Sequence, residues 1–198
     1  MLLKNFQDKK PECGTDEAGR GCLAGPVTAA AVILPDDISA EIINDSKQLS
    51  AQQRTQMAEF IKSNAITYGI AHVMPEKIDE INILQASILA MHLAIEKLET
   101  QPKFILVDGN KFKPYQKIPH QCIIKGDAKY LNIAAASILA KKARDDYMSQ
   151  LHDKFPQYNW KQNKGYPTQQ HIKAIDEHGK NAYHRKSFQL KRQIKLSL

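Results

Sequence analysis

The chain has 198 residues, of which 42% are hydrophobic and 25% charged, and its formal net charge is +7. These values exclude a disordered or fibrous chain, and no apolar run is long enough to be a signal peptide or to span a membrane, so we expect one folded, cytoplasmic domain. The excess positive charge favours a polyanionic partner such as nucleic acid over a neutral or acidic one.

The first half of the chain alternates apolar runs with amphipathic segments. Residues 27–34 (VTAAAVIL) form a continuous apolar run that is typical of a buried strand, and residues 13–17 are expected to form its upstream neighbour. Ser50 is a favourable N-cap for a mostly polar helix over residues 50–64. Strand character returns over residues 66–73.

The second half contains elements of both kinds. Apolar residues at three- and four-residue spacing predict helices, and the longest such stripe repeats strictly every four residues. The expected elements are one or two helices over 75–98, strands over 104–107 and 121–124, a long helix over 131–151, a polar connection over 155–167, and a last helix from Thr168 to Gly179. Strands that alternate with helices place the chain in the α/β class.

Residues 13–27 (CGTDEAGRGCLAGPV) combine adjacent acids with closely spaced glycines. Asp16 and Glu17 stand directly before Gly19 and Gly21. A dinucleotide-type phosphate cradle is a poor match, because the glycine spacing differs and a strand follows where a helix is needed. Two ionised carboxylates also repel a bare phosphate unless a cation lies between them. The segment therefore favours a metal site.

Two further acids lie at the ends of predicted strands. Asp108 directly follows one of them, and Asp127 comes shortly after another. Open α/β sheets bind ligands at the carboxyl ends of their strands, so we expect both to converge with Asp16 and Glu17. Four carboxylates suit a pair of Mg²⁺ or Mn²⁺ ions, which can support phosphodiester cleavage. Taken singly, each acid has a simpler interpretation as a turn residue, a helix cap or a strand end.

The cysteines give no sign of a disulfide or zinc site. Cys13, Cys22 and Cys122 are odd in number and far apart, and none belongs to a C-x-x-C pair. Reduced thiols are therefore expected.

A dense series of short motifs runs through most of the chain. In order, these are GTDEAGRG at 14–21, LAGPV at 23–27, NDSKQLS at 44–50, INILQASILAM at 81–91, VDGN at 107–110, KGDAKYLNIAAASILAK at 125–141, RD at 144–145, FPQY at 155–158, KGYPT at 164–168 and HRKSF at 184–188. With these motifs the sequence resembles ribonuclease HII of the bacterial type. The resemblance implies a ribonuclease H-like fold, with a central mixed β-sheet flanked by helices, in a single domain over 1–198 whose part over 156–198 is a C-terminal helical extension.

The resemblance also implies an activity. Members of the family are endonucleases that cut the RNA strand of RNA/DNA hybrids and incise DNA on the 5′ side of an embedded ribonucleotide, as in ribonucleotide excision repair, leaving 3′-hydroxyl and 5′-phosphate ends. Their metal-binding carboxylates fall on Asp16, Glu17, Asp108 and Asp127, the same four acids as above. A monomer with no membrane partner is expected. The alternatives are a metal-dependent nuclease or strand-transfer enzyme that ignores ribose, and a noncatalytic module that binds hybrids.

Several residues are implied to contact the substrate. Gly19, Arg20 and Gly21 are expected to contact the ribose 2′-hydroxyl through backbone groups, which glycine leaves accessible. Tyr166 is expected to stack on the sugar next to the RNA–DNA junction, with a core tyrosine as the alternative. Weaker candidates, for which a solvated or capping side chain is the alternative, are Ser46, Lys47, Asn82, Ser137, His184, Arg185 and Lys186.

Three further features are less specific. Cys22 stands where many relatives have proline, and a small neutral thiol is expected to be tolerated there. Arg144 and Asp145 are interpreted as an ion pair on the long helix. Residues 193–198 (QIKLSL) resemble short peptides that dock on bacterial sliding clamps, with an amphipathic tail as the alternative.

Overall fold

A computed structural model gives the fold and describes residues 2–7, 10–38, 43 and 50–189. Ser46 and Lys47, two of the expected substrate contacts, lie outside the described residues. The same holds for the clamp-like segment over 193–198.

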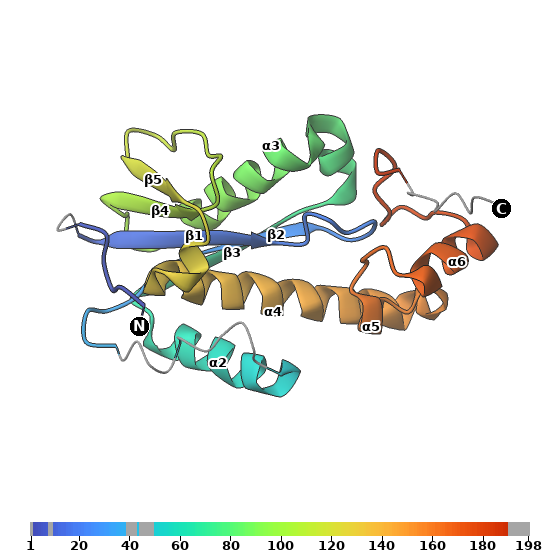
Figure 1. The fold of residues 1–198 in the computed structure, drawn as a ribbon, viewed down its shortest axis with the longest axis horizontal. Helices are drawn as coiled ribbons and strands as arrows, with labels where there is room; N and C mark the ends of the chain where they lie inside the picture. Colours follow the sequence, from blue (N-terminus) through green and yellow to red (C-terminus); the bar gives the residue numbers. More distant parts are fainter. Residues whose placement is uncertain (1, 8–9, 39–42, 44–49, 190–198) are drawn as a thin grey trace, which may run out of the picture.

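A mixed sheet of five strands forms the centre of the molecule, as expected (Figure 1). The strands are β1 (Glu12–Ala18), β2 (Val27–Ile33), β3 (Thr67–Val73), β4 (Phe104–Asp108) and β5 (His120–Ile123), in the spatial order β3-β2-β1-β4-β5. β2 is antiparallel to both of its neighbours, whereas β1, β4 and β5 are mutually parallel. Because β1 and β4 are parallel, their carboxyl ends meet at one end of the sheet.

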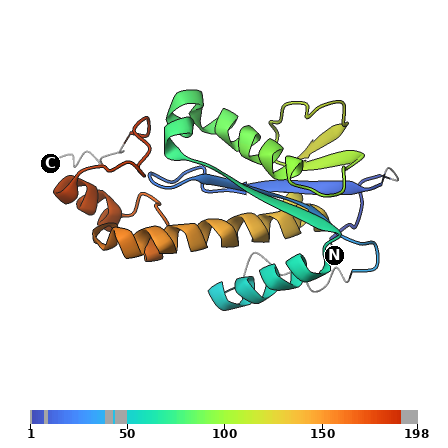
Figure 2. The ribbon, with the colours of Figure 1, turned by 180° about the vertical axis from the view of Figure 1, so that it is seen from behind.

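Helices cover both faces of this sheet (Figures 1 and 2). α3 (Pro75–Glu96) packs on one face, and α4 (Leu131–Lys154), with α2 (Ala51–Asn64) against it, packs on the other (Figure 1). The chain also contains α5 (Trp160–Asn163), α6 (Gln169–His178) and the single 3₁₀ turns η2 (Gly126–Ala128) and η3 (Pro156–Tyr158). Ala29 and Ala31 of β2 pack in the cluster with α3, and Ala30 and Val32 pack in the cluster with α4 and α2. β2 is buried on both faces, which explains its continuous apolar sequence.

Capping side chains set the predicted ends of two helices. The Ser50 hydroxyl accepts from the backbone N–H of Gln53 at 3.3 Å, and the Gln53 side chain accepts from the N–H of Ser50 at 2.9 Å, which together form a capping box. Thr168 caps α6 by accepting from the N–H of His171 at 3.2 Å, and the helix ends at Gly179. The residue types predicted the starts of both helices and the end of α6.

The segment over 75–98 was predicted as one or two helices, and α3 combines both descriptions. It consists of two helical parts that meet at a kink at Asn82, whose φ of 66° and ψ of 165° are not helical. By length and composition alone α3 could cross a membrane. In the structure it packs along β2 and β3, with one side buried in the core, as a core helix of a globular protein does.

The C-terminal part forms a lobe beyond the sheet, at the end of α4 (Figure 1). Trp160 and Tyr158 stack on each other within it and pack against Met148 and Leu151 of α4. The polar connection predicted over 155–167 contains η3 and α5. These elements have three and four residues, which is too short for a periodic pattern to reveal them. The description of 156–198 as an extension of one domain stays a prediction.

Candidate active site

Asp16 and Glu17 lie near the carboxyl end of β1, the central strand of the sheet. Asp16 is only 7% exposed. Its carboxylate accepts a hydrogen bond from the N–H of Glu17 at 2.7 Å and another from the side chain of Ser137 on α4. The sequence identified Ser137 as a substrate contact, and the structure places its hydroxyl on a site carboxylate.

Asp108 ends β4, the parallel neighbour of β1. Its Oδ1 accepts from the N–H of Gly126 at 2.7 Å and from the N–H of Asp127 at 3.4 Å. The turn after β5 therefore returns to the end of β4 and sets Asp127 beside Asp108. This is the strand-end convergence that the sequence predicts for parallel neighbours.

The carboxylates are close enough to perturb one another. Burial raises the pKa of Asp16 well above its usual range, and the charges of Glu17 and Asp108 raise it further. Burial also raises the pKa of Glu17, although Arg20, whose Nη1 lies 3.0 Å from Glu17 Oε1, opposes that shift. The structure thus brings Asp16, Glu17 and Asp108 into one electrostatic neighbourhood, with Asp127 adjoining it.

The donor set fits a hard divalent cation. Within the described part of the chain, no three His, Cys, Asp or Glu side chains already have the geometry of a metal site. Neighbouring carboxylates repel one another, and a cation among them would relieve that repulsion. All the donors are oxygens, which suits Mg²⁺ or Mn²⁺ better than a soft metal.

The glycine segment, residues 19–21, turns out of β1 beside these acids. Gly19 has a φ of 94°, and a Cβ built on it would lie 1.9 Å from Nε of Arg144. Gly21 differs, because a Cβ built there would meet no described heavy atom within 4 Å. The fold therefore requires glycine at position 19, whereas at position 21 the missing side chain leaves open space.

Tyr166 lies next to the glycine segment and is 42% exposed. Its backbone N–H donates to the carbonyl of Asn163 at 2.9 Å, and its carbonyl accepts from Nδ1 of His171 at 2.9 Å. Its hydroxyl is hydrogen-bonded to the buried thiol of Cys22. The three cysteines are free, as expected. The sequence placed Cys22 as a tolerated departure and did not anticipate its contact with Tyr166.

The expectation that the side chains of His184 and Arg185 grip phosphates is wrong. Both are buried, with 1% and 0% exposure. Nε2 of His184 lies 3.3 Å from Nε2 of His171, and the guanidinium of Arg185 donates to backbone carbonyls. Of this basic cluster, Lys186 is exposed.

The expected ion pair between Arg144 and Asp145 is also wrong. Asp145 pairs with Lys141, one turn earlier on α4, and with Arg54 of α2. Arg144 is fully buried and donates to backbone carbonyls of Pro26, Ala24 and Lys164. Successive helical residues diverge by about 100°, which is why adjacency in sequence does not make a pair.

Asn82 is exposed at the break in α3, and its side chain already has a structural use. Its Oδ1 accepts from the N–H groups of Leu84 at 3.0 Å and Gln85 at 3.2 Å, so it caps the second part of the helix. One turn earlier, Asp79 accepts from the N–H of Lys186 at 2.8 Å. This end of α3 is thus tied to the C-terminal segment.

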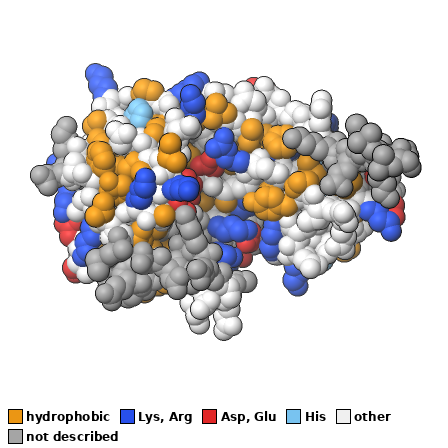
Figure 3. All heavy atoms as spheres, viewed as in Figure 1, with side chains coloured by type: hydrophobic (Ala, Val, Ile, Leu, Met, Phe, Trp, Pro, Cys, Tyr) orange, Lys and Arg blue, Asp and Glu red, His pale blue; other side chains and the backbone are white. Residues whose placement is uncertain are grey.

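Charged side chains on the molecular surface are arranged around the end of β1. In the face drawn in Figure 3, acidic side chains lie near the middle, over the carboxyl end of β1, with Lys and Arg side chains around them. A cation at the acids and a basic surround would together favour a phosphodiester backbone.

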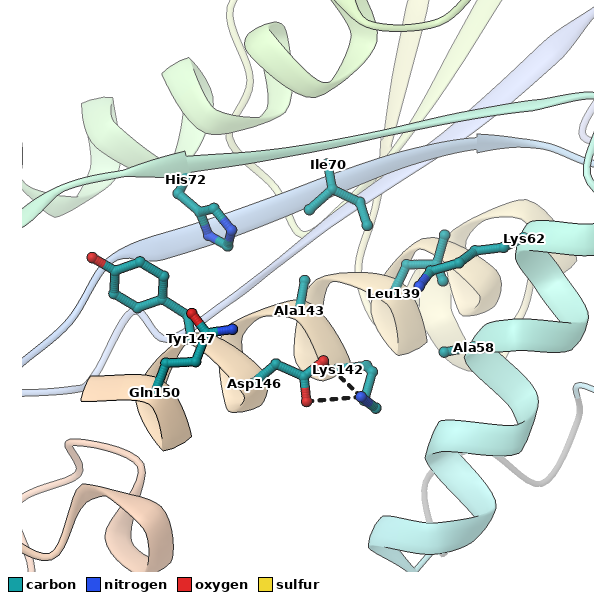
Figure 4. Close-up of a pocket in the computed structure, with 10 residues that line it drawn as sticks. All are labelled: Ala58, Lys62, Ile70, His72, Leu139, Lys142, Ala143, Asp146, Tyr147 and Gln150. Atoms are coloured by element: carbon teal, nitrogen blue, oxygen red, sulfur yellow. Dashed lines mark hydrogen bonds and ion pairs between the residues drawn. The ribbon is translucent and has the colours of Figure 1, made fainter. Parts of the chain in front are cut away.

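A separate pocket of about 200 Å³ lies between α2, β3 and α4 (Figure 4). His72 and Tyr147 line it, with ring centroids 5.4 Å apart, and its acid, Asp146, is paired with Lys142. None of the residues expected to form the active site lines this pocket, so it belongs to a different part of the surface.

Comparisons with known proteins point to one family over most of the chain. The family model described as Ribonuclease HII matches residues 13–191. The Ribonuclease HII of Christiangramia forsetii is 60% identical over 189 residues, covering 96% of each chain. Among solved structures, the RNase HII of Archaeoglobus fulgidus, in complex with PCNA, is 25% identical and covers 92% of this chain and 96% of that one, with a TM-score of 0.78.

A more distant structure shares the fold alone. Bst-RNase HIII in complex with Mn²⁺ is 17% identical and covers 89% of this chain and 66% of that one, with a TM-score of 0.67. The α/β architecture described above is therefore a ribonuclease H-like fold.

Proposed function

The chain belongs to the ribonuclease HII family, and from that premise we propose that it is a divalent-metal-dependent endonuclease. It hydrolyses the RNA strand of RNA/DNA hybrids and incises DNA 5′ of an embedded ribonucleotide, leaving 3′-hydroxyl and 5′-phosphate ends. The observation that carries the proposal is the cluster of Asp16, Glu17 and Asp108, with Asp127 adjoining, beside an open glycine segment.

Asp16, Glu17, Asp108 and Asp127 would hold Mg²⁺ or Mn²⁺. When bound there, such ions lower the pKa of a water and offset negative charge on the leaving oxygen. The chain itself orients the donors: the N–H of Glu17 and the Ser137 side chain hold the carboxylate of Asp16. Two N–H groups of the turn after β5 hold that of Asp108.

Ribose is selected next to these acids. The 2′-hydroxyl is the group that distinguishes RNA from DNA at a single site. The open space at Gly21 lets a sugar approach the main chain, and the exposed ring of Tyr166 is available to stack on the neighbouring sugar. Hydrogen bonds to Asn163 and His171 fix the backbone of Tyr166, and the hydrogen bond to Cys22 holds its hydroxyl.

A nicking assay tests the proposal. A duplex with one ribonucleotide is compared with the same all-DNA duplex in Mg²⁺ and in Mn²⁺, and the cut is mapped. We expect a nick on the 5′ side of the ribonucleotide, none in the all-DNA duplex, and loss of the nick in Asp16→Asn and Asp127→Asn. Equal cutting of both duplexes would identify a nuclease that ignores ribose. Intact duplexes with binding that persists in EDTA would identify a noncatalytic module.

The proposal also covers residues 193–198 and the cellular location of the protein. Because the Archaeoglobus fulgidus RNase HII was solved with PCNA, residues 193–198 are proposed to bind a sliding clamp. Loss of clamp pull-down on truncation after Arg192 would support this, whereas unchanged pull-down would contradict it. We further propose a cytoplasmic monomer.

A further inference from the structure

Two fully buried arginines lie beneath the glycine segment. Arg144 comes from α4 and Arg185 from the C-terminal segment, and both side chains are completely enclosed. None of the ion pairs found within the described residues includes either guanidinium. A buried charge without a counter-ion is rare unless hydrogen bonds replace the lost water.

Backbone carbonyls supply those hydrogen bonds for Arg144. Its Nε donates to the carbonyl of Pro26 at 2.9 Å, its Nη2 to that of Ala24 at 3.0 Å, and its Nη1 to that of Lys164 at 2.9 Å. One guanidinium thus joins the chain entering β2 to the segment that carries Tyr166.

Arg185 does the same for the glycine segment itself. Its Nη2 donates to the carbonyl of Gly19 at 2.7 Å and its Nη1 to that of Arg20 at 2.8 Å, while its Nε donates to the carbonyl of Gly25 at 3.1 Å. The ring of Phe188 covers the other side of the guanidinium, with its centroid 5.0 Å from Cζ. Three donors in one plane therefore hold three carbonyls of a single loop.

These contacts determine where the neighbouring amides point. In a trans peptide the C=O and the following N–H lie in one plane and point in opposite directions. Because the carbonyls of Gly19 and Arg20 point inward to Arg185, the N–H groups of Arg20 and Gly21 point away from it. A Cβ built on Gly21 would meet no described heavy atom within 4 Å, so this part of the main chain is open to approach.

We propose that Arg185 is a positioning residue that orients the peptide planes of residues 19–21 for recognition of the ribose 2′-hydroxyl. Arg144 supports it by holding the adjoining chain at Ala24, Pro26 and Lys164. This inference rests on the proposed function. Lysine would keep the charge but has no planar fork, so it cannot hold three carbonyls in a fixed relation. Replacing arginine by lysine therefore changes the hydrogen-bonding geometry and leaves the positive charge in place.

The substitution Arg185→Lys tests the proposed positioning role. With Ca²⁺ in place of Mg²⁺ to prevent cutting, fluorescence anisotropy gives the Kd for a duplex with one ribonucleotide and for the same all-DNA duplex. We expect the ratio of the two Kd values to fall by about tenfold in the variant, the size of one or two hydrogen bonds. The Kd for the all-DNA duplex should change little, because the charge is kept.

Tyr158→Phe is the matched control. It removes the 2.8 Å hydrogen bond from the Tyr158 hydroxyl to the carbonyl of Gly179 in the same lobe, but no contact to the glycine segment. A purely structural effect lowers the melting temperature or the fraction of active protein and leaves the Kd ratio unchanged. We expect this variant to keep the wild-type ratio.

The wild-type protein provides a test that does not depend on a folded variant. In ¹⁵N-labelled protein with Ca²⁺, the amide signals of Arg20 and Gly21 should shift with the ribonucleotide duplex and much less with the all-DNA duplex. Unshifted signals, or a wild-type Kd ratio in a folded Arg185→Lys variant, would overturn the inference. A wild-type protein that neither prefers nor cuts the ribonucleotide duplex would instead overturn the proposed function.

Discussion

At the scale of single residues, Asp16 is a carboxylate buried beside two others. Its folded-state pKa lies above its unfolded value because of burial, Glu17 and Asp108. Without metal, the folded state thus binds more protons than the unfolded chain, and stability falls as the pH rises above the unfolded pKa of about 4. Asp16→Asn removes this effect.

Asp16→Asn should therefore melt at a higher temperature than wild type in EDTA at pH 8, with a smaller difference at pH 4.5. Its cleavage rate in Mg²⁺ should fall by at least about 100-fold, because even outer-shell changes at metal sites have effects of 10–100-fold. Thermal melts and the nicking assay measure both. Asp153→Asn, on the exposed side of α4, is the control and should change neither. A lower melting temperature for Asp16→Asn at pH 8 would contradict the electrostatic account.

The two glycines of the segment over 19–21 should respond differently to alanine. Gly19→Ala forces a side chain onto Arg144 at a positive φ and should destabilise the protein by about 1–3 kcal/mol or more. Gly21→Ala should change stability by less than about 0.5 kcal/mol but lower cleavage at a single ribonucleotide. Urea denaturation and the nicking assay separate the two effects. If Gly21→Ala cuts as wild type does, the sugar does not lie in that space.

At the scale of elements, α4 connects the parts of the site. Ser137 contacts the carboxylate of Asp16, and Arg144, seven residues later on the same face, holds the chain entering β2. Met148 and Leu151 continue that face into the C-terminal lobe. One straight helix thus spaces the acids, the glycine segment and the lobe relative to one another.

The break in α3 offers another test at this scale. Asn82 combines a glycine-like backbone conformation with a capping side chain. Asn82→Gly keeps the backbone conformation but loses the capping side chain, and should lower the free energy of unfolding by about a few tenths of a kcal/mol. Asn82→Ala loses the cap and also strains the backbone at a positive φ, and should lower it by about 1–3 kcal/mol. Thermal melts compare the two. If Asn82 also contacts substrate, Asn82→Gly should raise KM despite near-normal stability; an unchanged KM would leave it a structural residue.

At the scale of the whole molecule, a buried histidine pair helps to join the lobe together. His171 and His184 meet through their Nε2 atoms, and Trp160 Nε1 donates to His171 at 3.0 Å. Burial, with the neighbouring His171 and Lys180, lowers the pKa of His184 to about 4. Between that value and its unfolded pKa of about 6.5, the unfolded chain binds more protons, so stability falls as the pH falls through this window.

His184→Gln should therefore flatten the acid side of the stability profile. Between pH 6.5 and pH 4.5 the melting temperature of wild type should fall more steeply than that of the variant, which lacks the imidazole of His184 and keeps that of His171. His178→Gln, at the exposed end of α6, is the control and should keep the wild-type slope. Parallel profiles for wild type and His184→Gln would exclude the pair as a source of acid sensitivity.

Several features of this protein follow from its sequence alone. The capping residues Ser50 and Thr168 set helix starts, the apolar runs set the strands, and Asp108 at a strand end indicated where a site would form. Each of these depends on patterns within a few residues, where the sequence and the local structure are directly related.

Only the tertiary structure decided which side chains face the interior. His184 and Arg185 read as a surface cluster in a charged segment, yet both are buried, and Gly19 and Gly21 look equivalent but have different surroundings. The reason is physical: the partners of Arg185 include Gly19, 166 positions away along the chain. Burial and hydrogen bonding between such distant segments depend on how the sheet and α4 bring them together, which no local pattern encodes.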